Sequence, residues 1–344
     1  AAAAYTWAQS KGFEEYTKGL LGVSWQHEYN SNTTQKTSVF SSFLNSYEPR
    51  PFNILKEETN GIGIRTRLIQ NTTLFKNELN WTIGIELFND ANSYQTYKNL
   101  YNTVPSGSEL IQGELLSNFK ERRTYFNLFF DSKYTFSKKI HYTLGLNLNK
   151  TSYHLKDNLI NNIPNFSGNY SFKTMISPKI GIVYKNSLST MLYGSISHGF
   201  SPPTLEETLL PDGLINSTIE PESGWNYEIG SRGQLFKNTV YFDIAIYRMD
   251  VKNLLVARRT SNDEYMGVNA GKTQYNGLEF TLKNTFIKTK NITLFGFHSF
   301  AYNDFKFKKF IDDSNDYSNN LLTGVPKLTY NATIGLESLN GFYT

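Results

Sequence analysis

The chain has 344 residues with 25 Phe, 23 Tyr, 4 Trp and no cysteine, and 34 basic against 30 acidic residues leave a formal net charge of +4. The many aromatic groups exclude a disordered chain, the lack of cysteine excludes a disulfide scaffold, and the even charge balance gives no indication of a nucleic-acid partner. No run of about 18 apolar residues is present, which excludes a transmembrane helix.

Residues 1–17 carry little structural information, and the four opening alanines are compatible with placeholder residues. From residue 18 onwards, apolar and polar residues alternate. Apolar residues occupy every second position in segments 62–68, 79–87, 140–148, 240–246, 278–282 and 328–336. This period is that of β-strands with two different faces, and no segment of 12 or more residues has a convincing helical period. The sequence therefore predicts an all-β chain from residue 18 to residue 344.

Short and long connections alternate along the chain. Short links fall near residues 72–77, 137–139, 185–187, 236–238 and 288–291, and long polar loops near residues 47–58, 89–120, 154–168, 201–223 and 304–323. A soluble β-sandwich, the alternative for the apolar rows, does not require such an order. An outer-membrane barrel does, because its periplasmic turns are short and its extracellular loops long. Strands of about 10 to 16 residues would also suffice to cross a bilayer.

The strand count bears on whether a barrel can close. The pattern gives about 13 strands, and another is expected to begin near Phe342. Bacterial barrels have an even number of strands and must close, because an open edge in lipid leaves backbone groups unpaired. We therefore expect an antiparallel transmembrane β-barrel of which this chain is a segment of 13 to 14 strands. A closed 14-stranded barrel is the alternative.

A series of short motifs resembles a known family. The stretch YGSISHGFSPPTLEE at 193–207 is followed by IEPE at 219–222, NYEIG at 226–230, NAGK at 269–272 and NGLE at 276–279. This order resembles the barrel of TonB-dependent outer-membrane receptors, especially the ferric-siderophore class. SPK at 177–179 and GVPK at 324–327 match further recurring positions of that barrel. The resemblance is specific over residues 177–338 and only compatible with the family before them.

The resemblance implies a 22-stranded barrel with a plugged lumen, and a plug domain and TonB box that this chain lacks. It implies a receptor in the bacterial outer membrane that binds an iron chelate at its extracellular loops and imports it to the periplasm. The implied partners are outer-membrane lipid or lipopolysaccharide, the iron chelate, and the TonB complex through the plug; no nucleic acid is expected. The alternatives are a passive porin and a non-transporting barrel that is a structural partner in an envelope complex.

Candidate ligand-binding residues are aromatic and arginine side chains of the expected loops, because aromatics give broad contact and arginines match anionic groups. They are Tyr94, Tyr97, Tyr101, Phe166, Tyr170, Arg258, Arg259 and Tyr265. A second set of charged residues falls on the polar face of the strands, where we expect contact with the plug: Arg65, Arg67, Glu86 and Glu279.

No catalytic site, metal site or cofactor is expected. The five histidines are scattered, with none at the spacing of a metal-ligand pair, and the chain has neither a Gly-x-Ser-x-Gly motif nor a phosphate-binding loop. The sequence therefore favours a non-enzymatic protein.

Overall fold

The computed structural model describes residues 7–159, 165–208, 210, 216, 218–259, 265–312 and 315–343, and within these ranges it leaves out the side chains of residues 205, 206, 259, 265 and 312. Almost every described element is a β-strand. In chain order the elements are β1 (Glu15–Asn30), β2 (Thr33–Pro49), β3 (Ile54–Leu74), β4 (Asn77–Asn99), the 3-10 helix η1 (Tyr101–Thr103), β5 (Gln112–Thr135), β6 (Ile140–Asp157), β7 (Gly168–Ser171), β8 (Met175–Lys185), β9 (Thr190–Ser201), the helix α2 (Leu205–Thr208), β10 (Glu222–Leu235), β11 (Val240–Lys252), β12 (Leu255–Arg259), β13 (Tyr265–Asn269), β14 (Lys272–Lys288), β15 (Ile292–Lys309), β16 (Ile311–Asp312), β17 (Asn315–Asp316) and β18 (Leu328–Ser338).

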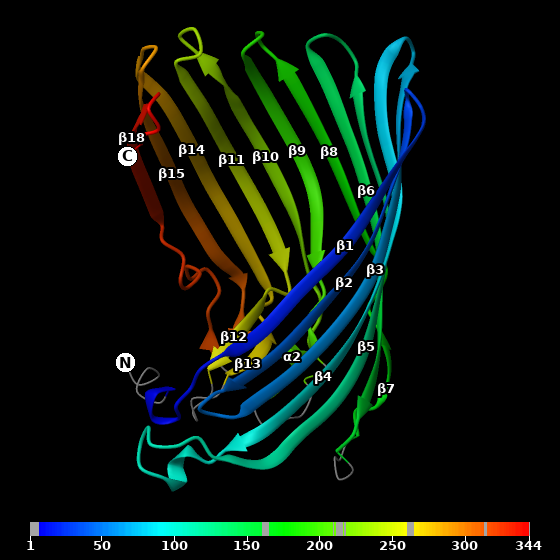
Figure 1. Ribbon diagram of the computed structural model, residues 1–344, viewed down its shortest axis with the longest axis vertical. Coiled ribbons are helices and arrows are strands. Elements are labelled where there is room, and N and C mark those ends of the chain that lie inside the picture. The colour runs from blue at the N-terminus through cyan, green and yellow to red at the C-terminus, as the bar shows by residue number, and fades with distance from the viewer. Residues whose placement is uncertain are drawn as a thin grey trace.

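The described strands form one long antiparallel sheet and two small hairpins, as Figure 1 shows. Thirteen strands follow one another in the order β1-β2-β3-β4-β5-β6-β8-β9-β10-β11-β14-β15-β18, and β7 pairs with β6 beside this path. The predicted count of about 13 strands is confirmed. Within the described part of the chain, β1 pairs only with β2 and β18 pairs within the sheet only with β15, so the sheet has two open edges and differs from a closed 14-stranded barrel.

The two ends of the sheet differ. At one end the strands are joined by short turns, and at the other, which we call the long-connection end, by η1, α2 and the hairpins β12–β13 and β16–β17. The link between β3 and β4 is only Phe75-Lys76, and both residues have positive φ (50° and 67°), as the tight turn that matches strand twist requires. The predicted alternation of short and long connections is therefore present from β3 onwards, whereas the link between β2 and β3 has only residues 50–53.

The outward face of the sheet carries an apolar band. Ile83, Ile85 and Leu87 of β4 stand opposite Phe130, Leu128 and Phe126 of β5, and the six side chains share one face. The three β4 residues keep 40–43% of their surface exposed, because no other described part of the chain covers them. An apolar face of this kind, with polar residues on the other side of each strand, is that of a barrel wall in lipid.

The opposite, inward face carries aromatic rings that lie directly against glycines of the neighbouring strand. Five such pairs are in register: Phe40–Gly63, Gly84–Phe129, Tyr193–Gly230, Tyr247–Gly277 and Phe295–Gly335. In each pair a Cβ atom on the glycine would overlap the ring. Gly230 and Gly277 belong to the motifs NYEIG and NGLE, and the groups that approach them are Tyr193 and Tyr247.

Several strands extend beyond the expected boundaries. β3, β4 and β5 have 21, 23 and 24 residues, about twice what a bilayer crossing needs. The loops expected at residues 47–58 and 89–120 shrink to residues 50–53 and 100–111, and β1 begins inside the segment 1–17. The physical reason is that the pairing of β4 with β5 continues past Leu87, whereas the alternation of apolar and polar residues does not. The outward residues beyond Leu87, such as Asn89 and Ser93, are polar. A strand with two polar faces therefore resembles a loop in composition.

No described helix has the length and apolar character needed to cross a membrane.

Candidate functional site at the long-connection end

The extended ends of β3 to β6 bury a small apolar cluster on the inward face. Its members are Leu55, Tyr94, Phe119 and Leu155, and Phe119 has no exposed surface. Phe119 stands directly opposite Tyr94 on β4. This is the main buried apolar core among the described residues, and it fixes the inward wall near the long connections.

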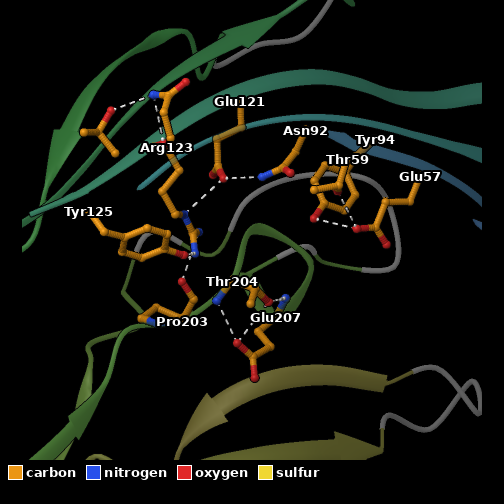
Figure 2. A network of polar contacts seen from close by, with 12 residues as sticks. Glu57, Thr59, Asn92, Tyr94, Glu121, Arg123, Tyr125, Pro203, Thr204 and Glu207 are labelled. Carbon is orange, nitrogen blue, oxygen red and sulfur yellow. Dashed lines mark hydrogen bonds and ion pairs between the residues drawn. The ribbon is translucent and has the colours of Figure 1, made fainter. Parts of the chain in front are cut away.

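Beneath this cluster lies a layer of buried charge on β4 and β5. The side chains of Glu121 and Arg123 are only 1% and 5% exposed, and Glu121 Oε1 lies 3.2 Å from Arg123 Nε. Asn92 Nδ2 donates to Glu121 Oε1 at 3.0 Å, as Figure 2 shows. Asp90 stands directly opposite Arg123 in the register of β4 and β5. A buried guanidinium therefore faces two carboxylates of the same wall.

The buried charges shift the acid–base properties of their neighbours. Burial raises the pKa of Asp90 to about 6, with Arg123 opposing the shift and Glu121 adding a smaller contribution to it. Burial alone would lower the pKa of Arg123, but Glu121, Tyr125 and Asp90 together outweigh burial, and the pKa rises. Arg123 consequently remains charged near neutral pH.

The same layer holds the connection between β9 and β10. Arg123 Nη1 donates to the Tyr125 hydroxyl at 3.2 Å, and Nη2 donates to the Pro203 carbonyl at 3.1 Å (Figure 2). The residues after Pro203 are organised locally, because Glu207 Oε2 accepts hydrogen bonds from both the backbone N and the hydroxyl of Thr204. Arg123 thus ties the start of this connection to the barrel wall.

Four buried polar atoms of this layer have no hydrogen-bond partner among the described residues: Asp90 Oδ1, Asn92 Oδ1, Glu121 Oε2 and Arg123 Nε. Leaving such atoms unpaired costs free energy, and they cluster at functional sites more than elsewhere. Sequence reasoning missed this layer because Asp90 and Asn92 fall within the loop expected at residues 89–120, and Glu121 and Arg123 follow directly after it. The available signal was Glu121 and Arg123, opposite charges two residues apart and therefore on one face of a strand.

The predicted ligand-binding residues divide between two regions, the wall of β4 to β7 with η1 and the hairpin β12–β13. Tyr94 lies in β4, is 5% exposed and donates to Glu57 Oε1 at 3.1 Å, so its expected place in an open loop is wrong. Phe166 packs against the same apolar cluster. Tyr170, in β7, stacks on Tyr153 with ring centroids 5.1 Å apart. Three of the predicted aromatics therefore gather on the wall formed by β4 to β7.

The other five predicted residues do not belong to this aromatic group. Tyr97 is in β4, where Lys56 Nζ lies 4.9 Å from the ring centroid, and Tyr101 begins η1. Arg258, in β12, donates from Nη2 to Met266 Sδ at 3.4 Å. The side chains of Arg259 and Tyr265 lie outside the described residues, although their backbones pair in β12–β13. The structure does not bring the arginines to the aromatic cluster.

The charged residues of the inward face form a ladder on β3 to β6. Arg65 forms an ion pair with Glu86, Asn127 Nδ2 donates to Glu86 Oε1 at 3.3 Å, and Asn149 Nδ2 donates to Asn127 Oδ1 at 2.7 Å. Arg67 is exposed on the same face, where it stands opposite Gly84. Glu279 is exposed on the inward face of β14, far along the strand order from this ladder.

No group of three or more histidine, aspartate or glutamate side chains that could hold a metal ion is found in the described part of the chain. The candidate site is therefore a polar and aromatic binding surface on the inward wall.

Solved structures with a similar fold are siderophore receptors and related transporters. The siderophore receptor PiuA from Acinetobacter baumannii matches with a TM-score of 0.72 and 14% identity, over 96% of this chain and 53% of that one. The ferric-catecholate import receptor Fiu from E. coli K12 matches with 0.68 and 14%, over 95% and 52%. The ferric citrate transporter FecA matches with 0.70 and 16%, over 94% and 47%. The chain thus spans about half the length of these proteins.

The family comparison covers nearly the whole chain. The family described as TonB dependent receptor-like, beta-barrel matches residues 2–344. Together with the open, two-faced antiparallel sheet, this match assigns the family: the chain belongs to the TonB-dependent receptor-like β-barrels.

Proposed function

We propose that this chain is the barrel wall of an outer-membrane receptor that binds an iron chelate of the siderophore type and imports it into the periplasm. The observation that carries the proposal is the two-faced wall of a chain in this receptor family: an outward apolar band, and an inward face lined with charged and aromatic groups. Members of this family are transporters rather than enzymes.

The ligand would bind at the long-connection end, where the aromatic and cationic candidates lie. Tyr97, Tyr101 and Tyr170 retain accessible surface there. Arg258, Arg259 and Tyr265 belong to the hairpin β12–β13 at the same end of the sheet (Figure 1). Aromatic rings and arginines suit a flat, anionic chelate because they supply broad contact and paired donors. Tyr94 and Phe166 would support this surface from behind.

The inward ladder would contact the plug. Arg65 keeps 54% of its side chain exposed although it is paired with Glu86, so it has further donors to offer. Arg67 and Glu279 are exposed on the same face. Energy from the inner membrane would reach the plug through the TonB complex, and lipid or lipopolysaccharide would cover the outward band.

Uptake of radioactive iron tests the transport proposal. Cells whose only receptor is the full-length protein are offered ferric chelates of the catecholate, hydroxamate and carboxylate classes, with and without a protonophore. We expect uptake of at least one class that stops when the proton-motive force is removed. Uptake that survives the protonophore would identify a passive channel, and no uptake of any class would identify a non-transporting barrel.

A further inference from the structure

Four basic residues gather on the outward face of β5 and β6. Lys120, Arg122, His154 and Lys156, which we call the basic cluster, are all exposed and line a surface depression of about 360 Å³. Residues of β3 and β4 complete the depression, and Glu121 of β5 also lines it; those of β3 and β4 are Glu58, Asn60, Ala91, Asn92 and Ser93.

The register places basic residues directly opposite each other. Lys120 pairs with Lys156, and Arg122 pairs with His154, at successive outward positions of the two strands. Like charges opposite one another destabilise a sheet, because the Cβ atoms of such a pair are only about 5 Å apart. No ion pair of the described residues includes Lys120, Arg122 or Lys156. Two carboxylates line the depression, Glu58 and Glu121, and Glu121 is already paired with Arg123. An anionic partner would relieve this repulsion.

The basic cluster lies just beyond the apolar band. Phe126 is the last apolar outward residue of β5, and Arg122 follows four positions further towards the long-connection end. At about 3.3 Å per residue and a tilt of about 40°, Arg122 stands about 10 Å above Phe126 along the barrel axis. Lys150 lies opposite Phe126 and begins the basic surface at the edge of the band. This is the height of lipid headgroups next to acyl chains that cover the band.

Another part of the wall differs at a comparable height. Arg248 of β11 follows Ile246 on the outward face, but it forms an ion pair with Asp250, with Nε and Oδ2 3.0 Å apart. Its charge is therefore neutralised within the chain. Lys120, Arg122 and Lys156 have no such ion-pair partner among the described residues, so their positive charge, unlike that of Arg248, is not neutralised by a carboxylate in direct contact.

We propose that the basic cluster binds the phosphate groups of an anionic outer-leaflet lipid whose acyl chains lie against Phe126 and the neighbouring apolar residues. Lys120 and Lys156 form one group of donors and the Arg122 guanidinium the other, so a headgroup with two phosphates fits better than one with a single phosphate. The inference rests on the proposed membrane location and is independent of which chelate is transported.

The test compares two matched variants of the full-length protein in detergent micelles. Lys120→Gln/Lys156→Gln removes two charges from the basic cluster, and Lys138→Gln/Lys139→Gln removes two from the turn at the other end of the same hairpin. Binding of bisphosphorylated lipid A, monophosphorylated lipid A and inorganic phosphate is measured by native mass spectrometry. Each charge lost near the headgroup lowers affinity about fivefold, so the first variant should bind bisphosphorylated lipid A about 25-fold more weakly and the second as the unchanged protein does.

Equal affinity of both variants for bisphosphorylated lipid A would overturn the proposal. So would displacement of the lipid by inorganic phosphate at equal concentration, because the ligand would then be a free anion. Arg122→Gln alone, expected to weaken binding about fivefold, provides a second test should the double variant fail to fold. Iron uptake by the Lys120→Gln/Lys156→Gln variant is measured in parallel, so that failure of transport and failure of lipid binding are distinguished.

Discussion

Replacing one member of the buried pair Glu121 and Arg123 should lower the free energy of unfolding strongly. Replacing both members together should lower it much less than the two single replacements combined. At their 3.2 Å separation the Coulomb attraction is about 5 kcal/mol for an effective dielectric constant of about 20. Removing two charges from water costs several kcal/mol each, which offsets most of this attraction. Replacing only one partner leaves the other charge buried without compensation, at a cost of about 3–5 kcal/mol.

Three variants measure this difference: Arg123→Met, Glu121→Gln, and both together. We expect Arg123→Met to lower the free energy of unfolding by about 3–5 kcal/mol, because Glu121 then keeps only the Asn92 amide. The double variant should lose at least 2 kcal/mol less than the sum of the single variants. Equilibrium unfolding in guanidinium, followed by tryptophan fluorescence of the protein in detergent micelles, gives these values.

Hydrogen exchange separates the charge effect from the loop contact. Both variants that lack Arg123 lose the donor to the Pro203 carbonyl, so amide exchange at Thr204 to Thr208 should rise equally in both. Glu121→Gln keeps that donor and is the control. Additivity of the single variants within about 0.5 kcal/mol would refute the interpretation of Glu121 and Arg123 as a coupled buried pair.

Two further predictions concern the same wall. Because the pKa of Asp90 is about 6 in the folded protein against 3.8 ordinarily, the folded state binds more protons between these values, and the free energy of unfolding should fall as pH rises from about 4 to about 6. Asp90→Asn should remove this slope in unfolding curves taken across that pH range, and an unchanged slope would assign it to another group. Phe119→Ala, at a position with no exposed surface, should cost about 3–5 kcal/mol in the same denaturant assay, whereas Phe136→Ala, at an exposed turn position, should cost less than about 1 kcal/mol. Equal losses would contradict the assignment of Phe119 to the core.

The sequence predicted those parts of the fold in which hydrophobicity differs between the two faces. Ile83, Ile85 and Leu87 alternate with polar residues, and their strand, its outward face and the tight turn before it follow from period and turn position. The number of strands was predictable in the same way, from the count of period-two segments. The extended ends of the strands were not predictable, because at Asn89 and Ser93 the outward residues are as polar as those of a loop.

The site was predictable in its residue types but not in its pairings. The period-two pattern puts Arg65 and Glu86 on the polar face of their strands, yet their ion pair depends on the register of β3 and β4, which composition does not encode. Tyr94 was expected in a loop and lies in the buried cluster, because burial is set by Phe119 on the next strand. Arg123 was not singled out, since its contact with Pro203 joins residues 80 positions apart.

The ring-on-glycine pairs of the inward face have a consequence for assembly. Each glycine accepts its ring only when the two residues are directly opposite, and a slip by one position would set the ring against a residue that has a Cβ atom and would exchange the two faces of the strand. Phe40–Gly63, Tyr193–Gly230 and Phe295–Gly335 lie at separate strand interfaces along the sheet. These pairs therefore fix the register of neighbouring strands locally, so that each added hairpin can align with the preceding strand before the barrel is complete.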